Sequence, residues 1–572
     1  MKSVVGDSRI IRFGAFELDV HAGELRKQGL KVRLQEQPLR ILQMLVSNPG
    51  ELVSREELRA ALWPSNSYLD FDQGLNRAIN KLREALGDSA EGPRFIETLA
   101  KRGYRFLHPM TNAVPEASIA VLPFLNLSTD PENELFADGM TEEIISTLSH
   151  IKNIHVVART SSFSFKGKHL DLRSIGQQLN VRTILEGSVR RSGDRLRITS
   201  QLVNAEDGYH LWSQQYDRKM EDIFGIQEEI ARSIAQTLEV TLDLEGKPLR
   251  GAGTENLEAF KLYVRGLSHF FQRPARLNAA VECLKNAVAL DPHYALAWSG
   301  LADAYHMVGF YGLASPEHCM PQGKLAATRS IELDPSLAEA HTSLAVSHLL
   351  HEWDWSSAER EFLHSLGLKP HNALARAWYG LFYLQWAAGR FEEGLAQVRR
   401  AVQIDPLSAS TRAILVHAYL PIDPDRSVET ALETLQTDLE SYTARWGQIT
   451  ALNLLGRFAE AAAVGETVLR SFGRPLWVMA SLARTYARLG KKSDSEALYM
   501  EFKWRAKREY LEPLWLGLAA FAAGEKDEAM RLVQHAHAIG VPTLLAGKYW
   551  PDFVEMREDL RFQEILRARG WT

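Results

Sequence analysis

The chain has few of the residues and patterns that define several common classes of protein. Among its 572 residues only Cys283 and Cys319 are cysteines, and no Cys-x-x-Cys pair occurs. This argues against a zinc ribbon or a dithiol redox site and suits a reducing compartment. No apolar run approaches the roughly 18–20 residues that a membrane helix needs, and the N-terminus lacks the hydrophobic core of a signal peptide. We therefore expect a soluble, cytoplasmic protein.

Patterns for enzymatic chemistry are also scarce. The stretch GKHLDL at 167–172 lacks the upstream glycine and the Ser or Thr of a phosphate-binding loop. No nucleophile–base pair and no His/Glu metal spacing appears. One acidic group could hold a cation, although a solvated loop and helix cap is the commoner reading of such a group; it comprises Asp130, Glu132, Glu134 and Asp138. The sequence thus predicts no enzymatic activity, no cofactor and no metal site.

What is present is ordinary globular composition with an uneven charge. The hydrophobic fraction is 45%, the charged fraction 24% and the net charge −5. Residues 1–108 nevertheless contain 17 Lys and Arg against 14 Asp and Glu, so the acidic excess lies in the rest of the chain. A mildly basic head on an acidic body is a weak indication of an anionic partner at the head. The length predicts three or more domains.

The head begins with strand-like alternation and then changes to helical spacing. The segment IRFGAFELDVHAGELRKQG at 11–29 alternates apolar and polar residues between glycines, which predicts a small antiparallel sheet. Leucines at helical spacing follow in 39–46. Ser54 with Glu57 three residues later forms a capping box, which opens a second helix that stops at Trp63–Pro64.

A third helix and a hairpin complete the head. The helix has an apolar stripe at spacings of four, three and four, formed by Leu75, Ile79, Leu82 and Leu86, and Gly87 ends it. Arg77, Asn80 and Lys81 then fall on other faces, and these residue types hydrogen-bond base edges and phosphates. The segment RFIETLAKRGYRF reads as two short strands joined by a turn near 101–103, where Gly103 permits the tight turn.

In order and in residues, the head resembles the winged-helix effector domain of OmpR/PhoB-type regulators. The resemblance assigns residues 9–108 to an α+β winged helix whose third helix enters the major groove of double-stranded DNA. It implies that Arg77, Asn80 and Lys81 face the groove. It also implies that Thr98 touches the DNA backbone near the base of the wing and that Lys101 and Arg102 of the wing meet phosphates. The alternative for each of these residues is a solvated helix face or turn. The order is that of CadC-like regulators, without their membrane helix and without a preceding phosphoacceptor receiver domain.

A middle segment, 117–240, mixes strands and helices and so predicts an α/β module after a short linker at 111–117. We expect a strand at 154–160 and two or three strands between 182 and 217. The strings IAVLPF, FADGMTEEI and LEGSVRRSGDRLRITSQLV resemble the TolB-N-terminal-like module, which implies a fold but names no chemistry.

The tail, 255–572, repeats. Pro292, Pro335, Pro370 and Pro406 are spaced by 43, 35 and 36 residues, and Gly456, Gly490 and Gly524 by 34 and 34. The pattern resembles the tetratricopeptide repeat, with about seven or eight units. That resemblance implies an all-α superhelix whose concave groove binds a protein or peptide.

Together these segments predict a one-component, sequence-specific transcription regulator. The head binds DNA, the middle module transmits or senses a signal, and the repeat tail binds a protein partner or self-assembles; a homodimer on DNA is possible. The alternative is an interaction scaffold whose winged helix docks protein rather than DNA. An enzyme in the middle module is a third, unsupported reading.

Overall fold

The computed structural model forms two compact units. The first combines Met1–Ser118 with Arg173–Arg182, and the second combines Ile119–Leu172 with Thr183–Thr572. The structure describes residues 10–568 apart from 14–15, 20–22, 28–29, 48–49, 51, 63–70, 91, 100–101, 108–110, 113–116, 129–131, 150, 152–153, 169, 193–194, 220–222 and 239–252. No helix within those ranges is both long enough and apolar enough to span a membrane.

The N-terminal unit contains two antiparallel sheets. The five-stranded sheet has the order β4-β3-β2-β1-β8, with strands β1 (Ile10–Phe13), β2 (Phe16–Asp19), β3 (Glu24–Lys27), β4 (Leu30–Val32) and β8 (Thr111–Asn112). The three-stranded sheet has the order β5-β7-β6, with β5 (Leu52–Ser54), β6 (Ile96–Leu99) and β7 (Gly103–Phe106). The segment 111–117 was predicted to be a linker. Its first two residues, Thr111 and Asn112, instead form β8 and pair with β1, so the prediction is wrong for them.

Three helices lie between these strands: α1 (Glu36–Ser47), α2 (Arg55–Leu62) and α3 (Phe71–Leu86). The predicted capping box is confirmed, because the Ser54 amide donates to Glu57 Oε2 at 2.7 Å and the Glu57 amide donates to Ser54 Oγ at 3.2 Å. The predicted stop at Trp63–Pro64 lies outside the described residues. Helices and sheets share one core, in which Phe13 packs edge-on against Phe106 with ring centroids 5.1 Å apart.

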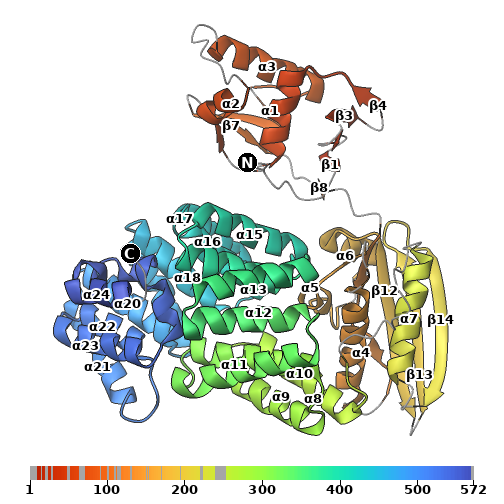
Figure 1. Cartoon of the computed structure of the whole chain (residues 1–572). Coiled ribbons are helices and arrows are strands. Elements are labelled where there is room, and N and C mark those ends of the chain that lie inside the picture. Colours follow the sequence, from red (N-terminus) through yellow and green to blue (C-terminus); the bar gives the residue numbers. More distant parts are fainter. Residues whose placement is uncertain are drawn as a thin grey trace. The chain divides into compact units, whose positions relative to one another are not determined.

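The middle module is a six-stranded sheet with helices. Its order is β11-β9-β12-β13-β14, with β10 pairing with β12. Helix α7 lies along β14, and α4 packs against α7 (Figure 1). The elements are β9 (Ser118–Val121), β10 (Leu125–Asn126), α4 (Glu132–Ser149), β11 (His155–Val156), α5 (Arg159–Phe163), α6 (Leu172–Leu179), β12 (Thr183–Ser192), β13 (Arg195–Asn204), β14 (His210–Lys219) and α7 (Ile223–Thr237). The strand expected at 154–160 is therefore too long, since α5 begins at Arg159.

This early helix makes several contacts with the repeats. The hydroxyl groups of Thr160 and Ser161 both donate to the carboxylate of Asp405, which follows a repeat helix. The Leu407 amide donates to Ser161 Oγ at 3.0 Å. Arg159 pairs with Glu142 of α4 and also lies 5.3 Å from the ring centroid of Phe271 in the repeats. We call this set of contacts around α5 the seam; it joins the middle module and the repeats.

The tail is all-helical, and its helices stack in antiparallel pairs (green to blue in Figure 1). Gly456, Gly490 and Gly524 have φ values of 72°, 72° and 94° and end the first helix of their pairs, as the left-handed φ of a helix-ending glycine allows. Eight pairs occupy the described residues 257–538: α8 (Leu257–Phe271) and α9 (Leu277–Leu290); α10 (Ala295–Phe310) and α11 (Pro316–Leu333); α12 (Ala338–Ser347) with η2 (His348–Glu352) and α13 (Trp355–Leu368); α14 (Ala373–Trp378) with η3 (Tyr379–Ala387) and α15 (Phe391–Ile404); α16 (Ala409–Tyr419) and α17 (Pro424–Thr437); α18 (Tyr442–Leu454) and α19 (Phe458–Ser471); α20 (Leu476–Arg488) and α21 (Lys492–Arg505); α22 (Pro513–Ala522) and α23 (Lys526–Ala538).

The C-terminal segment folds back onto these pairs. It consists of η4 (Pro542–Lys548), η5 (Pro551–Phe553), η6 (Met556–Glu558) and α24 (Leu560–Ala568). The Trp550 ring lies 4.8 Å from that of Trp446 and 5.3 Å from that of Trp386. Asp552 is fully buried and accepts hydrogen bonds from Ser481 and Arg484. The segment is therefore part of the core of the repeats.

Gly103 provides a test of the winged-helix packing. A Cβ atom there would lie 2.1 Å from the Val53 carbonyl oxygen, which the neighbouring strand β5 cannot easily move. We expect Gly103→Ala to lower the local opening free energy of β5 and β7 by about 1–3 kcal/mol, the usual cost of overpacking. Hydrogen exchange of their amides measures this. Gly92→Ala is the matched control, because only the Ser89 hydroxyl lies within 4 Å of a Cβ there, at 3.9 Å; equal exchange in both variants would contradict the packing argument.

Candidate nucleic-acid interface

Helix α3 turns one face into the core and leaves the other face polar. Its apolar stripe is buried as predicted, with Leu75 and Leu82 0% exposed, Ile79 1% and Leu86 2%. Arg77, Asn80 and Lys81 are exposed. Because the stripe fixes the rotation of the helix about its axis, it also fixes the direction in which these polar side chains point.

The three predicted groove residues differ in their contacts. The Lys81 ammonium donates to Gln35 Oε1 at 2.7 Å, just before α1 begins. This exposed bond holds the lysine against the rest of the domain. Arg77 and Asn80 lie in the same helical turns on the exposed face. The structure therefore brings these three residues onto one surface.

A polar network that the sequence analysis missed joins α3 to the hairpin of β6 and β7. The Tyr104 hydroxyl donates to Asn76 Oδ1 at 3.1 Å, and the Arg55 guanidinium donates to the Tyr104 hydroxyl at 3.2 Å. Arg55 also lies over the Tyr104 ring, 5.9 Å from its centroid. These residues lie 28 and 49 positions apart, so no local spacing could indicate the network.

Arg83 is a further residue that sequence reasoning missed. It is only 7% exposed, and its Nη2 donates to the Ile96 carbonyl at 2.9 Å and to Thr98 Oγ1 at 2.8 Å. Thr98, which was predicted to contact the DNA backbone, is exposed. Its hydroxyl oxygen accepts this hydrogen bond from Arg83 of α3. Its hydroxyl hydrogen is not used by this bond. Arg83 therefore positions the hairpin relative to the helix.

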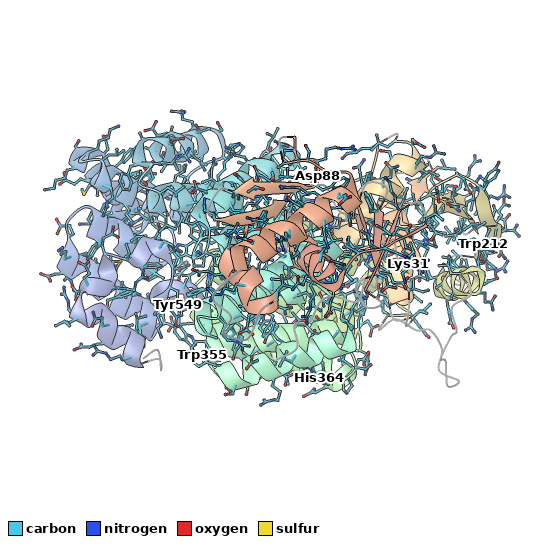
Figure 2. The ribbon with its side chains drawn as sticks, turned by 90° about the horizontal axis from the view of Figure 1, so that it is seen from above. Lys31, Asp88, Trp212, Trp355, His364 and Tyr549 are labelled. Carbon is cyan, nitrogen blue, oxygen red and sulfur yellow. The ribbon has the colours of Figure 1, made fainter. Side chains whose placement is uncertain are left out.

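The connection between α3 and β6 is fixed in the same way. Asp88, labelled in Figure 2, follows α3 and accepts hydrogen bonds from the amides of Arg94, Phe95 and Ile96 at 2.6, 3.2 and 2.8 Å. One carboxylate thus organises the start of the hairpin, since it satisfies three successive backbone donors.

At the tip of the hairpin, Arg102 is exposed and its backbone is tied on both sides. Its amide donates to the Leu99 carbonyl at 2.9 Å, and its carbonyl accepts from the Arg55 amide at 3.1 Å. Lys101 lies outside the described residues. Arg102 and Thr98 therefore lie on the hairpin, while the predicted groove residues lie on α3. The two groups of polar side chains are thus separate.

The acidic group considered as a cation site is partly occupied by a lysine. Lys166 Nζ lies 2.7 Å from Glu134 Oε1 and 2.6 Å from Asp138 Oδ1. Burial raises the pKa of the Asp138 carboxyl, against the hydrogen bond and charge of Lys166. Asp130 lies outside the described residues. In the described part of the chain, this acidic group included, no three His, Cys, Asp or Glu side chains gather as metal ligands.

Comparison with known families defines the class of protein. Residues 29–106 match the model described as transcriptional regulatory protein, C terminal. Residues 115–233 match the second domain of HilA/YgeH-like transcriptional regulators, and residues 276–309 match a TPR repeat. The chain thus carries an OmpR/PhoB-type DNA-binding domain, a HilA-like regulator domain and tetratricopeptide repeats, in the predicted order. Its class is that of DNA-binding transcriptional regulators with a protein-interaction tail.

Individual relatives belong largely to the same class. The chain is 23% identical over 415 residues to the transcriptional regulator HilA of Salmonella typhimurium, covering 70% of this chain and 72% of that protein. It is 32% identical over 97 residues to the phosphate regulon regulator PhoB of Rhizobium meliloti, covering 17% of this chain and 42% of that one. It is also 39% identical over 234 residues to a protein named putative adenylate cyclase 3 from Rhizobium meliloti, and spans 40% of the length of each.

Replacing Arg83 tests how the helix positions the hairpin. Arg83→Met keeps most of the side-chain volume but leaves the buried Ile96 carbonyl without its donor. We expect the opening free energy of the β6 amides to fall by about 1–3 kcal/mol, measured by hydrogen exchange. Glu84→Gln, one position along on the exposed face, is the control and should leave β6 unchanged. Protection in Arg83→Met equal to that of the control would show that Arg83 does not hold the hairpin.

Proposed function

We propose that the chain is a one-component, sequence-specific transcription regulator that reads double-stranded DNA with α3. The observation that carries the proposal is the exposed face of Arg77, Asn80 and Lys81 above a completely buried apolar stripe. Arg and Lys bind guanine edges, and Asn binds adenine edges, in the major groove. A helix anchored by a buried stripe offers these side chains in a fixed register.

The hairpin supplies the second, sequence-independent part of the interface. In this proposal Lys101 and Arg102 meet phosphates next to the groove, and Thr98 contacts the backbone near the base of the wing. Cations that neutralise phosphates add affinity for any sequence and make it salt-dependent. Arg83 and the Asn76–Tyr104–Arg55 network support this division, because they couple the position of the hairpin to that of α3.

The domains at 9–108, 117–240 and 255–572 divide the remaining work in this proposal. The repeats bind a protein partner or a second copy of the chain, and a homodimer would suit paired half-sites on DNA. The middle module transmits a signal. No catalytic step, cofactor or metal enters the proposal, and its setting is the cytoplasm.

The direct experiment is selection of genomic fragments by the purified full chain, followed by footprinting at two salt concentrations. A protected site that survives the higher salt supports the proposal and identifies the regulated genes. Weak, salt-sensitive and sequence-blind binding would instead favour a scaffold whose winged helix docks protein.

Two double variants test the division of labour within the interface. Arg77→Ala with Lys81→Ala should weaken binding to the selected site, at about 1–3 kcal/mol per lost base contact, and affect random DNA less. Lys101→Ala with Arg102→Ala should weaken binding to both DNAs alike and reduce the slope of log affinity against log salt by about one to two. Titrations at several salt concentrations measure both effects.

A matched control removes two cations elsewhere. Lys285→Ala with Arg329→Ala lies in the repeats, where each cation forms only an exposed ion pair with a glutamate three residues away. This variant has the same change in net charge and should bind DNA like the wild type. If all three double variants lost affinity equally on specific and random DNA, overall charge would explain the binding and the assignment of α3 as the reading helix would be wrong.

A further inference from the structure

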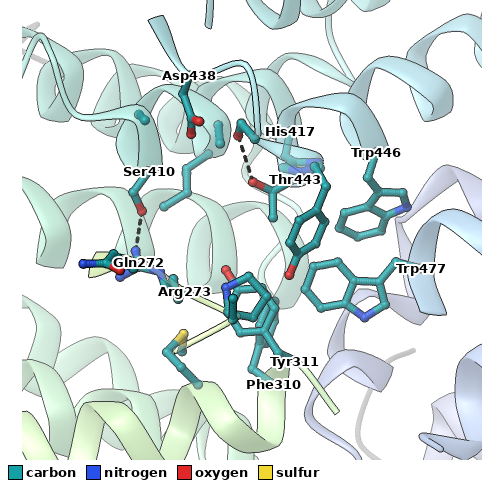
Figure 3. A pocket seen from close by; sticks show the side chains of 18 of the residues that line it. Gln272, Arg273, Phe310, Tyr311, Ser410, His417, Asp438, Thr443, Trp446 and Trp477 are labelled. Carbon is teal, nitrogen blue, oxygen red and sulfur yellow. Dashed lines mark hydrogen bonds between the residues drawn. The ribbon is translucent and has the colours of Figure 1, made fainter. Parts of the chain in front are cut away.

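The concave side of the repeats contains a cavity that the proposed function does not use. Its volume is about 710 Å³, and its lining comes from α8, α10, η3, α16, α18 and α20 and the loops beside them (Figure 3). Small-molecule sites commonly measure about 300–1,000 Å³ and combine apolar walls with a few polar groups. The cavity has the size of such a site, and its walls have that composition.

One wall of the cavity is aromatic. Tyr311 and Trp477 stack with ring centroids 4.9 Å apart, and Trp446 lies 4.9 Å from Trp477. Phe310 lies 5.1 Å from Phe382 and continues the wall on the other side of Tyr311. Flat, rigid side chains from four helix pairs thus face one space, which suits a ligand with a planar or hydrocarbon body.

Arg273 is the charged group of the cavity. It follows α8, its Nη2 donates to Ser410 Oγ, and its guanidinium lies 4.7 Å from the ring centroid of Phe270. Its Nη1 is shielded from solvent and has no hydrogen-bond partner among the described residues. In Figure 3 the arginine points into the cavity beside Tyr311. Burial raises the pKa of the Tyr311 hydroxyl, against the charge and hydrogen bond of Arg273, so this phenol stays neutral.

Arg273 has acidic groups near it, but within the described ranges no carboxylate forms a direct ion pair with it. Burial raises the pKa of Asp303 to about 7, against a hydrogen bond from Ser343 and the charge of Arg273, so this carboxyl is partly protonated near neutral pH. Asp438 and Glu440 also line the cavity, on the loop before α18. A shielded donor on an unpaired guanidinium is the group that an anion would satisfy.

The C-terminal segment argues for a small ligand rather than a peptide. Trp550 packs against Trp386, His417 and Trp446, all of which also line the cavity. Asp552 and Glu555 bind Arg484, with two 2.8 Å bonds between Glu555 and the guanidinium. Part of the concave surface is thus already covered by the chain itself, and what remains open is a compact space.

We infer that this cavity binds a small organic anion with an aromatic or hydrocarbon body, whose acidic group is held by the Arg273 guanidinium. The planar guanidinium of Arg273 can bind a carboxylate, sulfonate or phosphate by donating two parallel hydrogen bonds to its oxygens. The stacked rings of Tyr311 and Trp477 cover the body of the ligand. This site is separate from the DNA interface and does not depend on it.

The test compares two dyes that share a body and differ in charge. 8-Anilinonaphthalene-1-sulfonate carries a sulfonate, whereas N-phenyl-1-naphthylamine has the same rings without it. With the full chain we expect saturable binding of the sulfonate dye at one site per chain, followed by dye fluorescence and by quenching of tryptophan emission. Arg273→Gln should lower the affinity for the sulfonate dye by about tenfold to a hundredfold, the range for a lost charge-assisted hydrogen bond. It should leave the affinity for the neutral dye unchanged.

Two further variants keep the result interpretable. Arg265→Gln removes an exposed cation from α8, the helix that precedes Arg273, and should leave the binding of both dyes unaffected. Arg273→Lys keeps the charge but not the fork, so its affinity for the sulfonate dye should lie between those of the wild type and Arg273→Gln. Circular dichroism and thermal melting establish that each variant is folded.

The opposite outcomes are equally clear. Equal weakening of both dyes by Arg273→Gln would mean that the arginine only shapes the cavity, and the anion site would be wrong. Absence of saturable sulfonate-dye binding by the folded wild type would show that the cavity is not a ligand site. Displacement of the sulfonate dye by an aromatic peptide amide, which has no carboxylate, would also overturn the assignment.

Discussion

The larger unit depends on a buried carboxylate, Asp405. It is 5% exposed, and burial raises its pKa, against hydrogen bonds from the hydroxyls of Ser161 and Thr160. A carboxylate with so little access to water is tolerable only when such donors surround it. Because the donors come from the middle module and the acid from the repeats, each side satisfies the other. The seam therefore makes two segments that look separate in the sequence into one compact body.

The parts of the fold that the sequence predicts well are those fixed by local spacing. The stripe of α3 follows from four residues at helical intervals, and all four are buried. The capping box at Ser54 and the helix-ending glycine at Gly456 likewise follow from a few neighbouring positions. In each case the partners lie within a few turns, so the pattern contains the whole cause. The same reasoning places Arg77, Asn80 and Lys81 on the exposed face of α3. Helical periodicity predicts no other part of the candidate site.

What the sequence does not reveal is set by partners far along the chain. Arg83 reads as one more exposed cation of an amphipathic helix, yet the carbonyl of Ile96 takes its guanidinium into the core. The residues after β11 read as a continued strand, but Asp405, more than 240 positions later, requires hydroxyl donors there. Trp550 lies outside the repeat pattern, yet its ring packs against Trp446 on the concave side of the repeats. Spacing carries no information about such contacts, so they appear only in the folded chain.

The seam and the cavity share elements, and this bears on how the protein would respond to a ligand bound in the cavity. Phe271 lines the cavity while its ring lies 5.3 Å from the Arg159 guanidinium of α5. Ser410 holds Arg273 at the start of α16, five positions after Asp405. A ligand shifts an equilibrium only by its difference in affinity for the two states, so a ligand of this cavity would act on the middle module only if its contact with Arg273 differed between those states. Any ligand that moves Arg273 therefore acts on side chains one contact away from the bonds that hold the middle module to the repeats.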